Sequence, residues 1–159
     1  FNAMRRGVIG AKNPQKTAQK SPHLPACLDD LISEDDILPS RLLATRTYCH
    51  NMANHFASAA KVLKPQGRYV LVIGNSQTQK GVLPIHDSLI RLAADVGLAF
   101  EKAFAYRIRR HYMKFPRKGR GGIITMDWVV VLKKAEGRAD YPPRLPLPAF
   151  TLRDDEVAN

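Results

Sequence analysis

Apolar residues follow a helical period in the stretch that begins at Ser40 and ends at Leu63. They recur at steps of three and four residues, which places them on one face of a helix. This face consists of Tyr48, Met52, Phe56, Ala59, Ala60 and Leu63. Ser40 is a suitable N-cap because its hydroxyl can accept a hydrogen bond from a first-turn amide. The pattern therefore predicts one long helix whose apolar stripe faces the core.

A different pattern follows, in which Tyr69 to Ile73 are continuously apolar and rich in β-branched residues. Pro65-Gln66-Gly67 forms a turn before this run, and Gly74-Asn75-Ser76 closes it. Strands covered on both faces lack the alternation of apolar and polar residues that half-exposed strands show. The run is therefore interpreted as an interior strand. The alternative, a buried helical segment, is disfavoured because Gly67 and Gly74 leave too few residues for one.

The next elements are a second helix and two further strands. Gln77 to Gly81 is predicted to be a polar loop, after which Pro84 opens a helix that stops at Gly97. Apolar and charged residues alternate from Leu98 to Tyr112, which predicts a half-exposed strand. A second strand is predicted from Ile123 to Leu132, and the two form a long antiparallel hairpin.

The ends of the chain lack a sustained period. Residues 1–3 precede Met4 and are interpreted as a remnant of cloning. Residues 4–39 are predicted to be an irregular segment, and residues 40–134 form the structured half-domain. Residues 135–159 are a proline-rich tail, in which Tyr141 to Pro148 favours an extended conformation. This tail is either a flexible terminus or a segment that binds a partner.

Composition limits the possible functions. The 159 residues form at most one domain, and no window approaches the apolar length of a membrane span. Two cysteines, Cys27 and Cys49, suit a reducing cytoplasm and disfavour a disulfide framework or a zinc site. Twenty-five basic residues against fourteen acidic ones give a formal charge of +11. Such a charge favours a polyanionic partner such as nucleic acid, although a solvated basic surface is the alternative.

Two histidine-containing patterns were weighed as chemical sites. His50 and His55 are five residues apart, so they do not share a helix face at the spacing of a metal site. His86-Asp87 lies in the first turn of the second helix. An acidic residue there usually interacts with the helix macrodipole, so a structural role is favoured over catalysis.

The hairpin loop concentrates positive charge. The stretch from Arg107 to Arg120 holds seven basic residues and no acidic one, with His111, Tyr112 and Phe115 among them. The basic residues are Arg107, Arg109, Arg110, Lys114, Arg117, Lys118 and Arg120. Cationic groups neutralise phosphates, and exposed rings stack on unpaired bases. We expect nucleic-acid contact here; the alternative is a solvated loop.

The order of these elements resembles the C-terminal half of a class I S-adenosylmethionine-dependent methyltransferase. In that family a helix ending in V-L-K-P-G-G leads into the fifth strand, and here the turn reads V-L-K-P-Q-G, with Gln66 in place of the first glycine. The narrower resemblance is to the DNA amino-methyltransferase branch, which modifies exocyclic nitrogens of adenine or cytosine. It is carried by Arg5 to Gly10, Val70 to Ser76, Pro84-Ile85-His86 and Arg107 to Arg110.

The resemblance implies an α/β fold: a partial Rossmann-like sheet of strands five, six and seven, mixed and with an antiparallel hairpin, packed by two main helices. The family binds S-adenosylmethionine through a glycine-rich turn and holds the target amine with a Pro-Pro-Tyr or Pro-Pro-Phe loop. This sequence has neither G-x-G-x-G nor such a loop, and Ser21-Pro22-His23-Leu24 is only a partial approach. No catalytic or cofactor-binding residue is therefore assigned, and the chain alone is not expected to bind the cofactor.

The resemblance also implies an unpaired edge. The family's fifth strand lies between the fourth and the seventh, so a chain without the fourth strand exposes the Tyr69 to Ile73 edge. We expect a second copy of the chain to cover this edge, as a homo-oligomer; the alternative is the segment from Met4 to Leu38. Asn75 and Ser76 would face the target cleft. The expected function is thus the C-terminal part of a DNA methyltransferase, an enzyme only when completed, with DNA favoured over RNA. The alternative is a non-catalytic nucleic-acid-binding or protein-interaction module.

Overall fold

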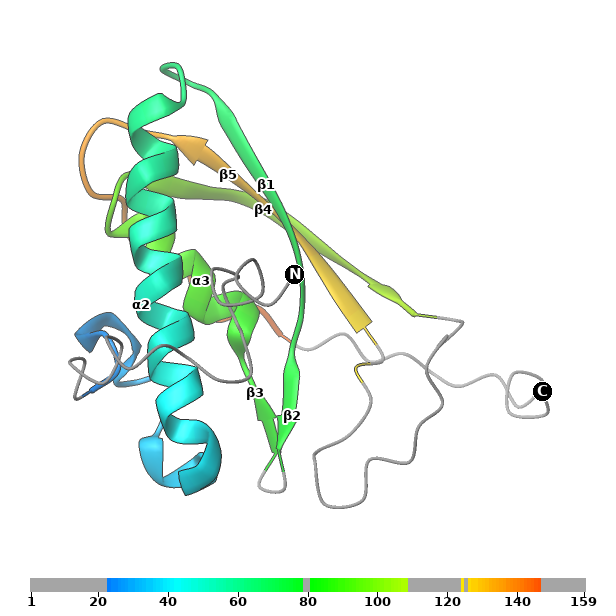
Figure 1. Ribbon diagram of the computed structural model, residues 1–159. Coiled ribbons are helices and arrows are strands. Elements are labelled where there is room, and N and C mark those ends of the chain that lie inside the picture. The colour runs from blue at the N-terminus through cyan, green and yellow to red at the C-terminus, as the bar shows by residue number, and fades with distance from the viewer. Residues whose placement is uncertain (1–22, 79–80, 109–123, 125, 147–159) are drawn as a thin grey trace, which may run out of the picture.

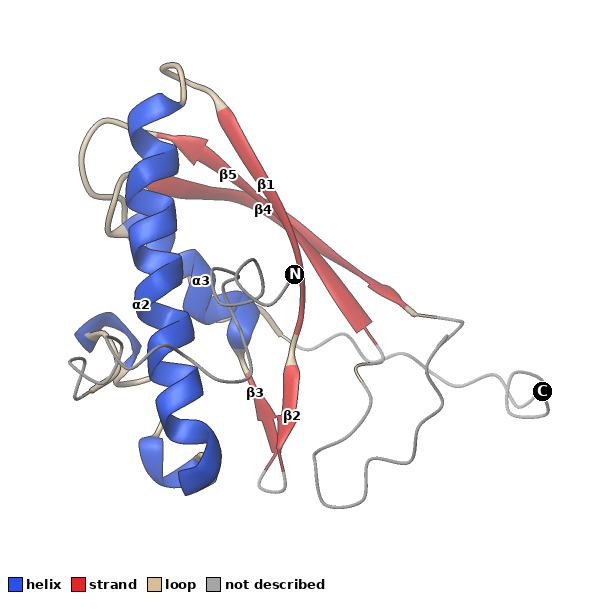
Figure 2. Ribbon diagram, in the orientation of Figure 1, coloured by secondary structure: helices blue, strands red, loops and turns tan. Residues whose placement is uncertain are grey.

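The structure of the protein is a computed structural model, which describes residues 23–78, 81–108, 124 and 126–146. A three-stranded sheet forms one layer, and two helices cover one of its faces (Figure 1). The helices are α2 (Pro39–Val62) and α3 (Ile85–Ala94). The sheet strands are β1 (Arg68–Gly74), β4 (Leu98–Arg107) and β5 (Met126–Lys134). Figure 2 shows this separation of helices and strands.

Strand β5, the last in the chain, lies in the centre of the sheet. The order is β1-β5-β4, and β5 is antiparallel to both neighbours. Leu71 is opposite Val130 on one side, and Ala103 is opposite Val130 on the other. An irregularity between Phe100 and Lys102 shifts the register of β4. The predicted fold class, an α/β arrangement with an antiparallel hairpin and two main helices, is confirmed. The sheet was predicted to be mixed, but its described strand pairs are both antiparallel, because β5 lies between the two strands that run parallel to each other.

Helix α2 begins one residue before the predicted N-cap. Its N-cap is Leu38, which makes no side-chain capping hydrogen bond, and Pro39 occupies the first turn. The prediction of Ser40 as N-cap is therefore wrong. Proline suits the first helical position because its missing amide hydrogen would have no intrahelical partner. Phe56, from the predicted stripe, is fully buried, as is Cys49, which the stripe did not include.

The turn between α2 and β1 contains a left-handed residue. Gln66 has φ of 61°, a conformation that glycine adopts without steric cost. The amide of Gly67 donates to the carbonyl of Lys64 at 2.9 Å, and Lys134 donates its amide to the carbonyl of Gly67 at 2.8 Å. The first bond closes the turn, and the second attaches the turn to the end of β5.

Three strand and loop boundaries differ from the prediction. Residues 77–81 were predicted to be a loop, but the chain forms a short antiparallel hairpin of β2 (Ser76–Thr78) and β3 (Gly81–Leu83). This hairpin is held by backbone hydrogen bonds and needs no buried face of its own. Its residues can therefore be polar, and the sequence shows no apolar pattern that would predict a strand. Strand β4 ends at Arg107 rather than Tyr112, and β5 begins at Met126 rather than Ile123. Residues 109–123 and 125 lie outside the described residues.

The interior-strand prediction for Tyr69 to Ile73 is corrected in one respect. Exposure alternates along β1: Val70 and Val72 are 57% and 58% exposed, whereas Leu71 and Ile73 pack against the core. Helices α2 and α3 lie on a single face of the sheet, so the described chain covers only that face. The continuous apolar run therefore does not show two-sided burial within this chain.

The described parts of both terminal segments pack onto the helices. The 3-10 helices η2 (Ala26–Leu28) and η3 (Glu34–Asp36) precede α2, and Leu28, Ile32 and Ile37 are buried. Glu34 accepts hydrogen bonds from Arg46 and from the amide of Leu24. The chain after β5 runs along α3.

Candidate functional site

The topology brings two predicted features to one end of the sheet. Strands β1 and β4 run parallel to each other because both are antiparallel to β5. Their carboxyl ends therefore lie together, and Gly74, Asp127 and Tyr106 form one row across the sheet. Asn75 follows directly after β1, and Arg107 closes β4 at the same end (Figure 1).

Asn75 links this end of β1 to the start of α3. Its side chain is buried, and Oδ1 accepts two hydrogen bonds from His86: from the backbone amide at 3.2 Å and from Nδ1 at 2.8 Å. Because a carboxamide oxygen only accepts, this geometry places the ring proton of His86 on Nδ1. Asn75 thus fixes both the first turn of α3 and the imidazole tautomer.

The His86 ring is buried and stacks on Trp128 of β5, with ring centroids 4.3 Å apart and planes 6° from parallel. Its Nε2 lies 3.6 Å from Oδ1 of Asp87. The same Asp87 oxygen accepts the backbone amide of Leu145 at 3.2 Å. Burial lowers the pKa of His86, and the negative charge of Asp87 opposes this only in part. The ring is therefore neutral at neutral pH.

Three buried polar atoms of this cluster have no hydrogen-bond partner among the described residues: Asn75 Nδ2, His86 Nε2 and Trp128 Nε1. Two are donors, and His86 Nε2 is an acceptor in the tautomer that Asn75 fixes. Unpaired buried polar atoms reduce stability and concentrate at functional positions. We define Asn75, His86, Asp87 and Trp128 as the buried polar cluster.

The other predicted site residues are only partly described. Ser76 opens β2 opposite Leu83, and Arg107 is opposite Met126. The remaining basic residues fall outside the described residues: Arg109, Arg110, Lys114, Arg117, Lys118 and Arg120. His86 was weighed in the sequence, but its stacking on Trp128 was not foreseen. The available signal was a histidine in the first turn of a helix that is rich in apolar residues.

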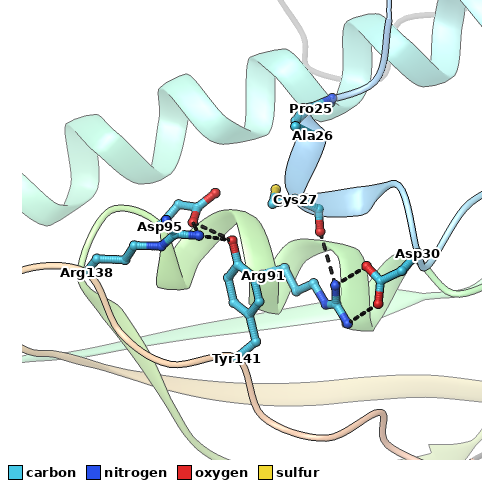
Figure 3. A pocket seen from close by; sticks show the side chains of 8 residues that line it. All are labelled: Pro25, Ala26, Cys27, Asp30, Arg91, Asp95, Arg138 and Tyr141. Carbon is cyan, nitrogen blue, oxygen red and sulfur yellow. Dashed lines mark hydrogen bonds and ion pairs between the residues drawn. The ribbon is translucent and has the colours of Figure 1, made fainter.

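A pocket of about 570 Å³ lies near the opposite end of α3 (Figure 3). Its lining consists of Pro25, Ala26, Cys27, Asp30, Arg91, Asp95, Arg138 and Tyr141. The charged groups pair with one another: Arg91 donates to both carboxylate oxygens of Asp30, and Asp95 accepts from Tyr141 at 2.6 Å and forms an ion pair with Arg138 at 2.9 Å. These contacts attach the segment after β5 to α3.

Cys27 in this pocket is a poor nucleophile. Burial, reinforced by a hydrogen bond and charge repulsion from Asp95, raises the pKa of its thiol to about 12. The reactive form of cysteine is the thiolate, which is scarce at neutral pH when the pKa is this high. The pocket is therefore better explained as the place where the segment after β5 packs against α3 than as a catalytic centre.

The described part of the chain has neither a metal-binding cluster nor a membrane-spanning helix. No group of three or more His, Cys, Asp and Glu side chains there is arranged to hold a metal ion. In the same residues, no helix has the length and apolarity needed to cross a membrane.

Comparison with known proteins gave two solved structures of protein TTHA0409 from Thermus thermophilus, which is named as a candidate DNA modification methylase. One is a selenomethionine derivative, 19% identical, with a TM-score of 0.44 over 64% of this chain and 45% of that chain. The other is a complex with S-adenosyl-L-methionine, 18% identical, with a TM-score of 0.44 over 65% of this chain and 46% of that chain. Scores of this size do not assign a family.

No family model matches the sequence, and a search of curated proteins also found no match. This chain spans less than half the length of the solved protein described above.

The buried polar cluster predicts a pH-dependent stability. The pKa of His86 is below its ordinary value of 6.5 in the folded state, so the unfolded chain binds the proton more readily. The contribution of neutral His86 to the free energy of unfolding is complete above about pH 6.5. It is lost as the pH falls towards the folded-state pKa. We expect the free energy of unfolding, measured by urea titration, to decrease from pH 7.5 to pH 5.5, and to decrease less in a His86→Asn variant.

Trp128→Phe is the matched control, because it keeps a ring stacked on His86 and removes no titrating group. Its destabilisation should be the same at both pH values. An unchanged pH dependence in His86→Asn would show that other groups cause the effect.

Proposed function

We propose that this chain is the C-terminal part of an S-adenosylmethionine-dependent methyltransferase that acts on amino groups of DNA bases. Strand order is the observation that supports the proposal best. β5 lies between β1 and β4 and is antiparallel to both. The sequence resemblance implies this arrangement for the fifth, seventh and sixth strands. In this topology the strand that comes last in the sequence lies between two strands that run parallel to each other. Apolar patterning alone does not require this arrangement.

In this proposal Asn75 and Ser76 contribute to the wall of the target cleft. Ligands of α/β sheets bind beyond the carboxyl ends of the strands. Asn75 stands at that position after β1, where its amide oxygen orients His86 at 2.8 Å.

The same end of the sheet is assigned to nucleic-acid contact. Arg107 closes β4 there, and six further basic residues follow between Arg109 and Arg120. Lysine and arginine bind the phosphate backbone through charge. The formal charge of +11 adds long-range attraction for a polyanion. A DNA partner is favoured over RNA by the resemblance to the DNA amino-methyltransferase branch.

The described residues do not fit S-adenosylmethionine by themselves. The family holds this cofactor with a glycine-rich turn and an acidic residue, whereas the carboxylates of the described pocket, Asp30 and Asp95, already bind Arg91, Arg138 and Tyr141. That pocket also lies at the end of α3 opposite Asn75. No reaction step is therefore assigned to this chain, and the cofactor site would come from the N-terminal half of a longer product or from a partner.

Isothermal titration calorimetry with S-adenosylmethionine tests this proposal. The chain alone should give no binding heat, and a mixture with the N-terminal half encoded upstream should bind. The matched control is the same N-terminal half with alanine in place of the glycines of its G-x-G-x-G turn, which should abolish the heat. Binding by the chain alone would contradict the assignment of the cofactor site to a missing half.

A non-catalytic nucleic-acid-binding or interaction module is the second candidate. It is favoured by the combination of a strong positive charge with the lack of a G-x-G-x-G turn and a Pro-Pro-Tyr loop in this sequence. Retention of DNA binding without any cofactor binding by the completed protein would support this candidate over the first.

The basic segment predicts a salt-dependent interaction with duplex DNA. Exchanging Arg109, Arg110, Arg117 and Arg120 for Ala should weaken binding. It should also flatten the plot of log K against log salt by up to about 0.9 for each phosphate that the variant no longer neutralises. Fluorescence anisotropy at several salt concentrations measures both effects.

The control replaces Lys61 and Lys64 by Ala, which removes positive charge beyond the opposite end of β1 and should leave the slope unchanged. If the arginine variant kept the original slope, the segment would be a solvated loop.

We also infer that a second copy of the chain pairs with the open edge of β1. In the described residues β5 is the single hydrogen-bonded neighbour of β1, so the other edge from Tyr69 to Ile73 presents unpaired backbone groups. Such an edge favours pairing with another strand. Of the alternative cover, the segment from Met4 to Leu38, η2 packs against α3, and residues 4–22 lie outside the described residues.

Light scattering should give a dimer, and amide exchange should be slow along Val70 to Ile73. A monodisperse monomer with fast exchange at these amides would overturn the pairing.

A further inference from the structure

The sheet face opposite the helices is apolar and exposed. Val70 and Val72 of β1 are 57% and 58% exposed, and Phe104 and Tyr106 of β4 are 56% and 44% exposed. The strand register places Val72, Val129 and Phe104 in one row across the three strands. We call this surface the outer face. Val131, opposite Val70 on the central strand, is on the same side but is buried, at 7% exposed. Single exposed apolar residues are ordinary, but a contiguous group on one rigid face marks an interaction site.

Among the described residues, no helix lies over the outer face, and Ile124 covers only its end at Gly74. Helices α2 and α3 lie on the other side of the sheet (Figure 1), and Leu71, Trp128 and Val130 belong to the core there. Pairing of two copies through the edge of β1 would extend the sheet sideways and leave the outer face open. The shape and the charge of the outer face therefore indicate what binds to it.

The dimensions of the outer face suit one helix. Neighbouring strands are about 4.8 Å apart, so the two outer strands are separated by about 10 Å, which matches the diameter of an α-helix. Valines on β1 and β5 form a low surface beside the larger rings of Phe104 and Tyr106. At one end Ile124 lies over Gly74, since a Cβ on that glycine would be 2.5 Å from Ile124 Cγ2. Helices cover sheets in this way in α/β folds.

The other end of the outer face is basic. Arg68 and Lys102 are exposed there, and Lys133 lies opposite Arg68 on the neighbouring strand. Glu101 pairs with Arg68 at 2.8 Å and compensates one of these charges. An acidic segment therefore complements this end, whereas a second copy would bring a basic end and its own charge of +11.

We propose that the outer face binds an amphipathic α-helix of a partner protein. Apolar residues of this helix at i, i+3, i+4 and i+7 contact Val70, Val72 and Phe104. Acidic residues near one end face Lys102 and Lys133. This proposal is independent of the methyltransferase assignment, because it rests on the exposed sheet face and not on the cleft.

The test uses two peptide probes of about 18 residues, or five helical turns. Both carry Leu at i, i+3, i+4 and i+7, and one has Glu at the polar positions near one end where the other has Lys. Methyl NMR spectra of the full chain are recorded during titration. The Glu peptide should shift the methyl signals of Val70, Val72 and Val129 and leave those of Val82 in place, and the Lys peptide should bind more weakly.

Variants locate the interaction. Val72→Lys should weaken Glu-peptide binding by at least about tenfold, because it removes valine burial and places a charge in the apolar contact. Val82→Lys is the matched control, an exposed valine of β3 away from the outer face, and should leave binding unchanged. Because Val72 is exposed, thermal unfolding of Val72→Lys should match that of the parent chain.

Two results would overturn the proposal. The first is the absence of methyl shifts with the Glu peptide, or equal shifts with both peptides. The second is that dilution alone shifts the Val72 and Val129 methyl signals, with sedimentation showing dissociation of a dimer. That outcome would assign the outer face to a second copy of the chain.

Discussion

The fold depends on the position of β5 between β1 and β4. This strand provides the hydrogen-bonded neighbour that each of the other two sheet strands has among the described residues. Trp128, Val130 and Leu132 are buried on its inner side, against α2 and α3. β5 therefore contributes the central part of the sheet surface on which the helices pack. Lys134 completes the link by donating to the carbonyls of Leu63 and Gly67 at the turn after α2.

The same strand order determines which residues meet at one end of the sheet. Because β5 is antiparallel to both neighbours, the carboxyl ends of β1 and β4 lie together, and Asn75 is brought to the end of the sheet where Arg107 closes β4. The buried polar cluster fixes this end in one arrangement, since Asn75 holds His86 and His86 stacks on Trp128.

Helix α3 connects the two ends of the described chain. Its first turn meets β1 through Asn75, and Asp87 there accepts the amide of Leu145. Its last turn holds Arg91 and leads to Asp95, which bind Asp30 from the N-terminal segment and Tyr141 from the C-terminal one. The proline-rich segment is thus attached along α3 as far as it is described. The sequence predicted this helix from Pro84 and Gly97 but not its polar contacts, because these join residues that are distant in sequence.

Local patterns in the sequence determined the elements of this protein. The helical period of α2, the apolar run of β1 and the alternation along β4 depend on neighbouring residues, so they were readable directly. The turn of the resembled family has glycine where this chain has Gln66. The positive φ of Gln66 is a conformation that glycine adopts without steric cost. Only the tertiary structure decided which faces are covered and which polar groups meet. The sequence indicated burial of both faces of β1, but α2 and α3 pack on one face, because burial depends on which other segments are present to pack against it. The contact of Asn75 with His86 and the stacking on Trp128 likewise depend on strand order, which no local pattern contains.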